Sequence, residues 1–137
     1  METKVLIIAV VENGKDEVLL RKKPDGSLPY KETWYLFGAT LVPGEAPADA
    51  LRAHLLKQTG VKARMVEALG WDTEVKADLD GITKQFVYLD MRCSYISGAL
   101  QPAPDIERLE WVPRAKLTEY DLVPPSRVLF KKLGYLR

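Results

Sequence analysis

The segment 34–61 constrains the fold more than any other part of the chain. It reads WYLFGATLVPGEAPADALRAHLLKQTGV, which is an apolar stretch, a glycine-containing turn and a run of helix-forming residues. Pro47 suits the first turn of a helix, where a missing N–H does no harm, and Gly60 is a typical C-terminal stop. The segment therefore predicts a strand at 36–42 and an amphipathic helix at 48–59.

Helical periodicity separates two faces of this predicted helix. At about 100° per residue, one face is expected to pack against the core. It carries Ala48, Leu51, Leu55 and Thr59. A different face carries Ala50, Ala53, His54 and Lys57.

The remainder of the chain predicts five further strands and one further helix. Asn13-Gly14 is a strong hairpin signal between the first two apolar runs. The strands are expected at 5–11, 17–23, 61–74, 82–95 and 109–112, and the second helix at 127–133. With no linker or internal repeat, this pattern predicts one α+β domain spanning 1–137.

Composition excludes several classes of function. The chain has 20 Lys+Arg against 19 Asp+Glu and a formal net charge of +1, which gives no bulk attraction to nucleic acid or acidic membranes. Cys93 is the single cysteine and lies in an alternating apolar run, so we expect a core residue. The apolar run 5–11 is far too short to cross a bilayer. We therefore expect a cytoplasmic protein with no membrane partner.

The spacing of residues 39–61, from Ala39 to Val61, resembles the Nudix box of MutT-like pyrophosphohydrolases. That box runs Gly, five residues, Glu, seven residues, Arg-Glu, an aliphatic residue, any residue, Glu-Glu, any residue, Gly and an aliphatic residue. Ala39 stands at its first glycine and Glu45 at its first glutamate. Gly60 closes it without a gap, with Leu55 at the aliphatic position.

The resemblance extends over nearly the whole chain. Trp34-x-Leu-Phe-Gly38 is similar to the Trp-x-x-Pro-Gly lead into the box, and Leu19-Leu20-Arg21 is similar to the second strand of the family. Glu110-Trp111-Val112-Pro113 is similar to a late strand of the family. The resemblance implies an α/β/α sandwich with a mixed β-sheet, in which the box forms a loop, a helix and a loop.

Besides Ala39 at the first glycine, four positions of the box depart from the family pattern. Ala53 and His54 replace Arg-Glu, and Lys57 and Gln58 replace Glu-Glu. The resemblance implies Mg²⁺ as the cofactor, and Mg²⁺ prefers several hard oxygen ligands. Here only the Glu45 carboxylate is kept, so Glu45 is at most a single metal ligand.

Each candidate site residue has a functional and a structural interpretation. Glu45 and His54 are the residual catalytic candidates; Glu45 could instead stabilise the helix N-terminus, and His54 could be a partly exposed helix residue. Lys57 could contact phosphate directly or be solvated. The candidate residues for binding substrate are Arg21, Trp34, Phe37, Gly38, Lys57 and Gln58.

The same two interpretations apply to the aromatic and acidic candidates. Trp34 and Phe37 could stack on a base or belong to the core, and Arg21 could lie at a cleft or form a surface ion pair. The acidic segment with Glu74, Asp78 and Asp80 could supply substitute ligands or be a polar turn.

Two functional hypotheses follow. The first is a Nudix-type domain that binds a nucleotide or a nucleoside-diphosphate-linked small molecule, with little or no Mg²⁺-dependent hydrolysis. The second is an active hydrolase that cleaves a nucleoside diphosphate derivative with non-standard metal ligands. The sequence leaves the oligomeric state open.

Overall fold

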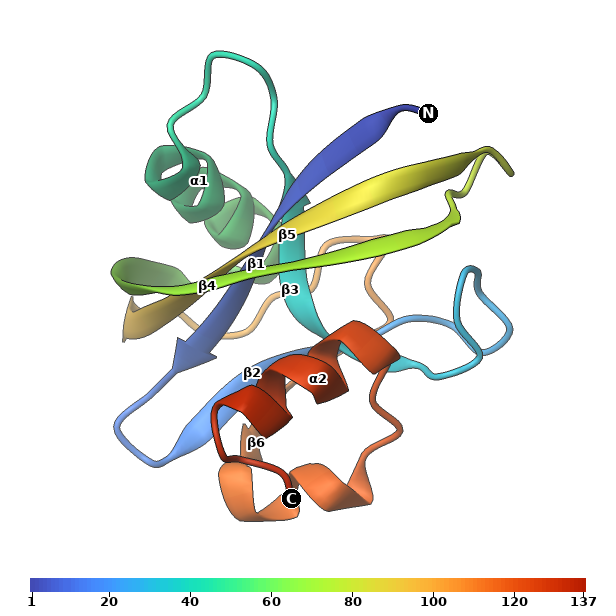
Figure 1. The fold of residues 1–137 in the computed structure, drawn as a ribbon. Coiled ribbons are helices and arrows are strands. Elements are labelled where there is room, and N and C mark those ends of the chain that lie inside the picture. The colour runs from blue at the N-terminus through green and yellow to red at the C-terminus, as the bar shows by residue number, and fades with distance from the viewer.

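A computed structural model describes all residues, 1–137, and contains one six-stranded mixed sheet (Figure 1). Its strand order is β4-β5-β1-β3-β2-β6. The β1–β5 pair is parallel and the other pairs are antiparallel, so the sheet is mixed. The strands are β1 (Thr3–Glu12), β2 (Glu17–Lys22), β3 (Trp34–Thr40), β4 (Lys62–Ala77), β5 (Thr83–Ser97) and β6 (Arg108–Pro113).

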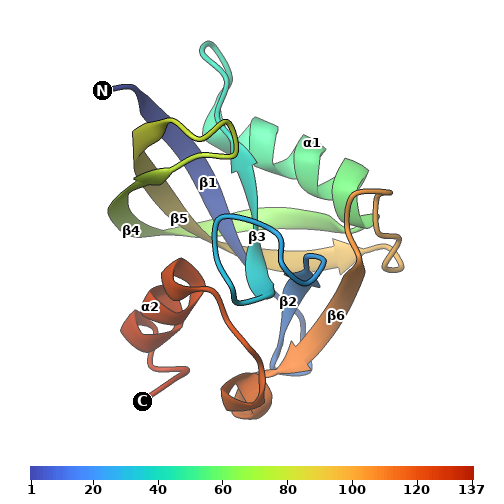
Figure 2. The same ribbon diagram turned by 90° about the vertical axis from the view of Figure 1, so that its right-hand side faces the viewer.

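Helices cover both faces of this sheet (Figures 1 and 2). They are α1 (Pro47–Thr59), the 3-10 helix η1 (Arg114–Glu119) and α2 (Pro124–Lys132). Neighbouring residues of β3 show the division, because Phe37 packs in the cluster under α1 while Leu36 packs in the cluster under α2. Side chains alternate between the faces of a strand, so the two clusters lie on opposite sides. This confirms the expected α/β/α sandwich.

The box helix begins and ends where the sequence predicts. Pro47 occupies its first turn, and Gly60 adopts φ 77° and donates its N–H to Leu56 at 2.9 Å. A Cβ at Gly60 would lie 2.6 Å from the carbonyl oxygen of Ala99, so the glycine also permits a close approach of the chain. None of the three helices is long and apolar enough to span a membrane.

One part of the helical-face prediction is wrong. The buried residues of α1 are Ala50, Leu51, Leu55 and Thr59. Ala48 is only half-buried, and Ala50 is 2% exposed. The periodicity of an isolated helix omits the other segments that pack around its first turn, and those segments decide the burial of a small side chain.

Other differences concern where elements begin and end. Helix α2 starts at Pro124 rather than at 127, because proline is compatible with a first helical turn. Strand β4 continues to Ala77, three residues past the expected end, and is paired with β5 throughout that extension. Cys93 is buried, as predicted.

Candidate functional site

A cavity with a volume of about 310 Å³ lies on the α2 face of the sheet. Its floor consists of one face of β1, β3, β4 and β5. Its walls come from the start of α2 and from the loop that joins β2 to β3, which passes in front of the sheet in Figure 2. The apolar part of the lining includes Leu6, Ile8, Leu36, Phe86 and Val123.

The start of α2 is fixed against β3. The backbone N–H of Leu36 donates to Oγ of Ser126 at 3.1 Å, and that serine is only 5% exposed. Val123, the N-cap residue, donates its N–H to the carbonyl of Trp34 at 2.9 Å. These bonds satisfy buried polar groups and set the separation between helix and sheet that forms the cavity wall.

One wall of the cavity is built around the ammonium group of Lys76. Its Nζ lies 2.7 Å from the hydroxyl of Tyr30, 3.0 Å from that of Tyr88 and 3.2 Å from the carboxylate of Glu74. The same nitrogen sits 4.6 Å from the ring centroid of Phe86. Burial opposes ionisation of Glu74, but the hydrogen bonds from the two tyrosines and the charge of Lys76 lower its pKa.

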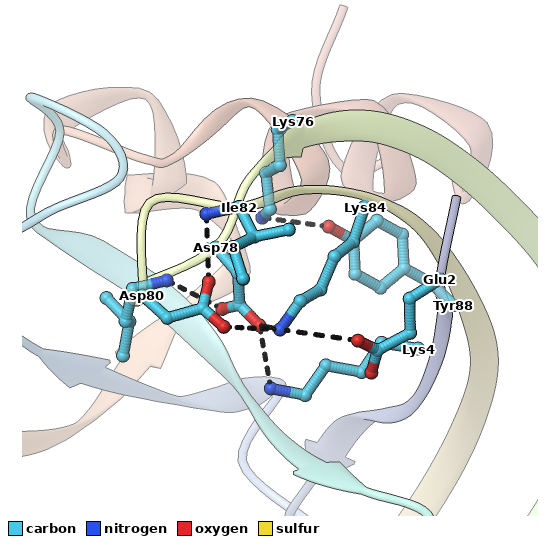
Figure 3. A network of polar contacts seen from close by, with 9 residues as sticks. Glu2, Lys4, Lys76, Asp78, Asp80, Ile82, Lys84 and Tyr88 are labelled. Carbon is cyan, nitrogen blue, oxygen red and sulfur yellow. Dashed lines mark hydrogen bonds and ion pairs between the residues drawn. The ribbon is translucent and has the colours of Figure 1, made fainter.

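A second charged cluster ties the β4–β5 turn to the start of β1 (Figure 3). The Lys84 Nζ lies 2.9 Å from both Asp78 and Asp80, and Lys4 lies 3.1 Å from Asp78. The hydrogen bond from Lys84 is the largest of the effects that lower the pKa of Asp78. The acids of this turn are thus bound to lysines, and Lys4 and Asp78 together line one end of the cavity.

Two further carboxyl groups, Asp72 and Asp90, line the cavity and were missed by the sequence reasoning. Asp90 is 3% exposed, and its pKa is raised by burial and by hydrogen bonding to Asp72. Asp72 is bound to Lys132 at the end of α2. Strand alternation would have found Asp90, because it continues the buried series of Phe86 and Tyr88.

Among the predicted binding residues, Arg21 and Gly38 line this cavity. The Arg21 guanidinium lies 4.3 Å from the ring centroid of Tyr35 and 4.9 Å from that of Phe37, and it donates to the Gly38 carbonyl at 3.4 Å. Its Nε is buried without a hydrogen-bond partner. Burial lowers the pKa of Arg21, while Tyr35 and Asp105 act in the opposite direction.

Gly38 allows the side chain of Ile8 to approach closely inside the sheet. A Cβ there would lie 3.0 Å from Cδ1 of Ile8, on the cavity face. The two aromatic candidates are packed in the two cores instead. Phe37 is 2% exposed under α1, and Trp34 is 8% exposed under α2, in edge-to-face contact with Tyr120.

The candidates in and before α1 lie outside the cavity lining. Glu45 accepts the N–H of Val42 at 3.1 Å and makes no capping bond to the helix. Lys57 is exposed, and His54 and Gln58 are half-buried. The Oε1 of Gln58 is buried with no partner, while its backbone carbonyl accepts the N–H of Ala103 at 3.0 Å.

The donor set around α1 does not fit Mg²⁺. The structure gathers no group of three or more histidine, cysteine, aspartate or glutamate side chains suited to a metal ion. An imidazole, an ammonium and an amide stand at 54, 57 and 58, and the Glu45 carboxylate is bound to a backbone N–H. Mg²⁺ prefers several oxygen ligands that include carboxylates.

Comparisons with known proteins agree with the sequence resemblance. The family profile described as NUDIX domain matches residues 2–133. A nucleoside triphosphatase, NudI, from Enterobacter sp. (strain 638) is 25% identical over 142 residues, covering 99% of this chain and 100% of the relative. NudI from Klebsiella pneumoniae subsp. pneumoniae is 26% identical with the same coverage.

Solved structures of low sequence identity share the fold. The MutT protein from Methanosarcina mazei Go1 superimposes with a TM-score of 0.79 at 18% identity, covering 97% of this chain and 94% of that one. The NUDIX domain of Shewanella oneidensis NrtR, solved with ADP ribose, gives a TM-score of 0.77 at 18% identity, covering 98% and 88%.

Proposed function

The chain belongs to the NUDIX family, and we propose that it binds a nucleotide-type ligand with little or no Mg²⁺-dependent hydrolysis. The observation that carries this proposal is the contrast between a formed cavity and a box helix with no carboxylate at positions 54, 57 and 58. The cavity has the size expected of a small-molecule site, with an apolar lining and a few placed polar groups.

The residues of α1 support binding without the usual metal. His54, Lys57 and Gln58 supply no negative charge, and an ammonium at 57 disfavours a nearby divalent cation. The box is therefore degenerate in its chemistry while its spacing and helix are kept. A single carboxylate, Glu45, leaves the ion with too few oxygen ligands.

Arg21 supports an anionic ligand. Its guanidinium lies 4.3 Å from the ring centroid of Tyr35 and 4.9 Å from that of Phe37, and its Nε–H has no partner inside the protein. Because Phe37 packs under α1, this guanidinium lies on the α1 face of the sheet, and a phosphate or pyrophosphate oxygen that approaches from that face would supply the missing hydrogen bond. Nucleoside-diphosphate-linked molecules, including ADP-ribose, supply such oxygens.

Calorimetry in EDTA tests the proposal. The protein is titrated with ADP-ribose, a sugar nucleotide and the nucleoside triphosphates, first in EDTA and then in Mg²⁺. The proposal is supported if a ligand binds in EDTA and if its affinity in Mg²⁺ is within about twofold of its affinity in EDTA. Absence of both heat and a thermal shift across the panel overturns it and favours a protein-interaction role.

The similarity to nucleoside triphosphatases along the whole chain favours a second candidate. In this version the protein hydrolyses a nucleoside diphosphate derivative with non-standard metal ligands, using Glu45 and His54. The test is release of phosphate or of a nucleotide product with Mg²⁺ or Mn²⁺ present. Activity that survives both Glu45→Gln and His54→Ala rejects these residues, and no activity rejects the hydrolase.

A further inference from the structure

The outer half of strand β4, residues 70–77, reverses the usual burial pattern of a strand with one covered face. Such a strand normally places apolar side chains inside and polar ones outside. Here the half-buried side chains are the charged ones, Asp72, Glu74 and Lys76. The exposed side chains are uncharged and are Trp71, Thr73, Val75 and Ala77. Because Asp72 and Lys76 face the cavity, the exposed series lies on the α1 face of the sheet.

Exposed apolar side chains gather along β4 and in the turn that follows it. Six of the twelve large apolar side chains that are exposed in the whole chain lie between residues 65 and 82. They are Met65, Val66, Trp71, Val75, Leu79 and Ile82. Trp71 is 71% exposed and Val75 is 59% exposed. Single exposed apolar residues are normal, but a cluster of this kind marks an interaction surface.

The outer edge of this half of β4 has no partner in the protein. β4 is the last strand of the sheet, and its only neighbour is β5. The pairing with β5 is irregular before Gly70 and regular from Gly70 to Ala77. The hairpin of β4 and β5 extends past α1, and no helix covers its end on that face (Figures 1 and 2). Bulges keep an edge from pairing with another chain, and residues 70–77 lack them, so their backbone is available to a further strand.

The charges of this region favour a second copy of the same chain as that further strand. The exposed face of residues 70–77 carries no charge. On the other face, Asp72 is bound to Lys132, and Glu74 and Lys76 are bound to each other at 3.2 Å. A charged peptide would find no free counter-charge here, whereas a strand related by a twofold axis meets a neutral surface that matches its own.

A twofold axis at Thr73 brings the exposed side chains of two antiparallel strands together. It places Thr73 opposite Thr73 of the other copy and Trp71 opposite Val75 of the other copy. Pairs of two threonines, and pairs of an aromatic with a β-branched residue, stabilise adjacent strands. The same face of both copies is joined, because directly opposite residues point to the same side of a sheet.

The exposed apolar area is sufficient for a specific contact. The axis at Thr73 carries the turn at residues 78–82 of one copy toward the start of β4 in the other, so all six exposed apolar side chains lie along the contact. Each exposes roughly 100 Å², so two copies would bury up to about 1,200 Å² in total. This is the lower end of the range of specific interfaces, which indicates a dimer that depends on protein concentration.

We propose that residues 70–77 of β4 form a homodimer interface, in which two copies pair antiparallel about a twofold axis at Thr73 and their sheets become continuous. The interface is independent of the proposed nucleotide binding. Asp72 and Lys76 reach the cavity from the same strand, so the two cavities lie on one face of the joined sheet, on either side of the axis.

Sedimentation velocity on the unmodified protein, from about 1 to 500 µM, tests whether the dimer forms. An interface of this area is expected to dissociate in the micromolar range, so the measured mass should rise from that of one chain to that of two. The mass of one chain at every concentration overturns the inference and leaves the edge to an extended segment of another protein.

An exchange of charges at Thr73 locates the axis. Thr73→Lys places two ammonium groups directly opposite each other, Thr73→Glu places two carboxylates there, and like charges in that position are destabilising. Each variant alone should dimerise at least about tenfold more weakly than the unmodified protein. An equimolar mixture of the two variants should recover the dimer, because lysine then faces glutamate.

The control for this exchange is Thr118→Lys, which adds the same charge at an exposed position of η1 and should leave dimerisation unchanged. Thr73 is itself exposed, so its variants should keep the fold, and circular dichroism checks that they do. Dimerisation of Thr73→Lys at the strength of the unmodified protein overturns the inference. A mixture that dimerises no better than its two components also overturns it.

Thr73→Cys gives a readout that does not depend on the dissociation constant. Cys93 is the single native cysteine and is buried, so the introduced thiol is the one that reacts readily. Directly opposite residues of an antiparallel pair have Cα atoms about 4.5–5.5 Å apart, which a disulfide can span. Mild oxidation should give a covalent dimer of Thr73→Cys in higher yield than of Thr118→Cys. Equal yields from the two variants contradict an axis at Thr73.

Discussion

The two faces of the sheet place their polar chemistry in opposite environments. On the α1 face, the helix is attached through buried apolar side chains such as Leu51 and Leu55, and Lys57 is in solvent. On the α2 face, Lys76, Asp90 and Ser126 are buried or half-buried around a cavity. Polar groups taken out of water require partners; Ser126 and Lys76 have them on the α2 face, whereas the buried Oε1 of Gln58 on α1 has none.

This difference shows that motif spacing and site chemistry are separable. The box spacing is kept because it builds a strand, a turn and a helix that cover one core. His54, Lys57 and Gln58 stand where the family pattern has glutamates, and the strand, the turn and the helix still form. Four measurements test the contrast between the two faces, in order of decreasing effect.

The largest effect is expected from Leu55→Ala in α1. Leu55 is 1% exposed, and its truncation leaves a cavity in the core, so the free energy of unfolding should fall by roughly 2–5 kcal/mol. Leu56→Ala is the matched control on the same helix, since Leu56 is 51% exposed, and should cost less than about 1 kcal/mol. Denaturant unfolding measures both. Equal losses of the free energy of unfolding in the two variants would show that α1 is not attached through its buried leucines, Leu51 and Leu55.

The next effect is the pH dependence of stability caused by Asp90. Its ordinary pKa of 3.8 is raised to about 8 in the folded protein, chiefly by burial. The contribution of protonated Asp90 to the free energy of unfolding is fully present below the pKa of Asp90 in the unfolded chain. It is lost as the pH rises through the pKa of Asp90 in the folded protein, because the unfolded chain releases the proton first.

Asp90→Asn has no such proton, so its free energy of unfolding should depend less on pH between about 5 and 8. Over that interval the unmodified protein should lose roughly 2–4 kcal/mol more than the variant does. Unfolding curves at several pH values measure this difference, and Asp49→Asn, which removes an exposed carboxylate on α1, should follow the unmodified protein. Parallel stability profiles for the unmodified protein and Asp90→Asn would contradict a buried proton at this site.

A smaller effect is expected from Ser126→Ala at the start of α2. The variant leaves the buried Leu36 N–H without its acceptor, which should cost roughly 1–3 kcal/mol. Ser97→Ala, at the exposed end of β5, is the control and should change stability by no more than about 0.5 kcal/mol. If the two variants unfold alike, the serine does not fix the helix against the sheet.

The smallest effect is expected from a variant that tests whether added carboxylates are sufficient to make α1 bind Mg²⁺. The triple variant His54→Glu, Lys57→Glu and Gln58→Glu places three carboxylates at i, i+3 and i+4 on one helix. Mg²⁺ at ten times its Kd should stabilise this variant by about 1.4 kcal/mol. The matched variant with glutamine at 54 and 57 should show no shift.

If Mg²⁺ also raises the free energy of unfolding of the unmodified protein, the contrast between the two faces is wrong, since α1 then has a metal site without these carboxylates. If Mg²⁺ does not stabilise the triple variant, adding carboxylates to α1 is not sufficient to make a metal site there.

The sequence by itself determined the order of the elements and most of their boundaries. Asn13-Gly14 joined β1 to β2, and Gly60 ended α1, because local turn and capping chemistry depends on a few neighbouring residues. The alternation at 82–95 predicted a strand there, and the spacing of 39–61, with the motifs outside it, predicted the family and the sandwich. Signals of this kind need no knowledge of distant parts of the chain.

Only the tertiary structure decided which side chains meet. It placed Trp34 and Phe37 in opposite cores, and it bound Asp78 and Asp80 to lysines from two strands. It also brought Asp72 and Asp90 into one cavity with α2, far along the chain. Burial and the identity of a partner are properties of the assembled sheet, and pKa shifts follow from them, so a strand read in isolation cannot supply them.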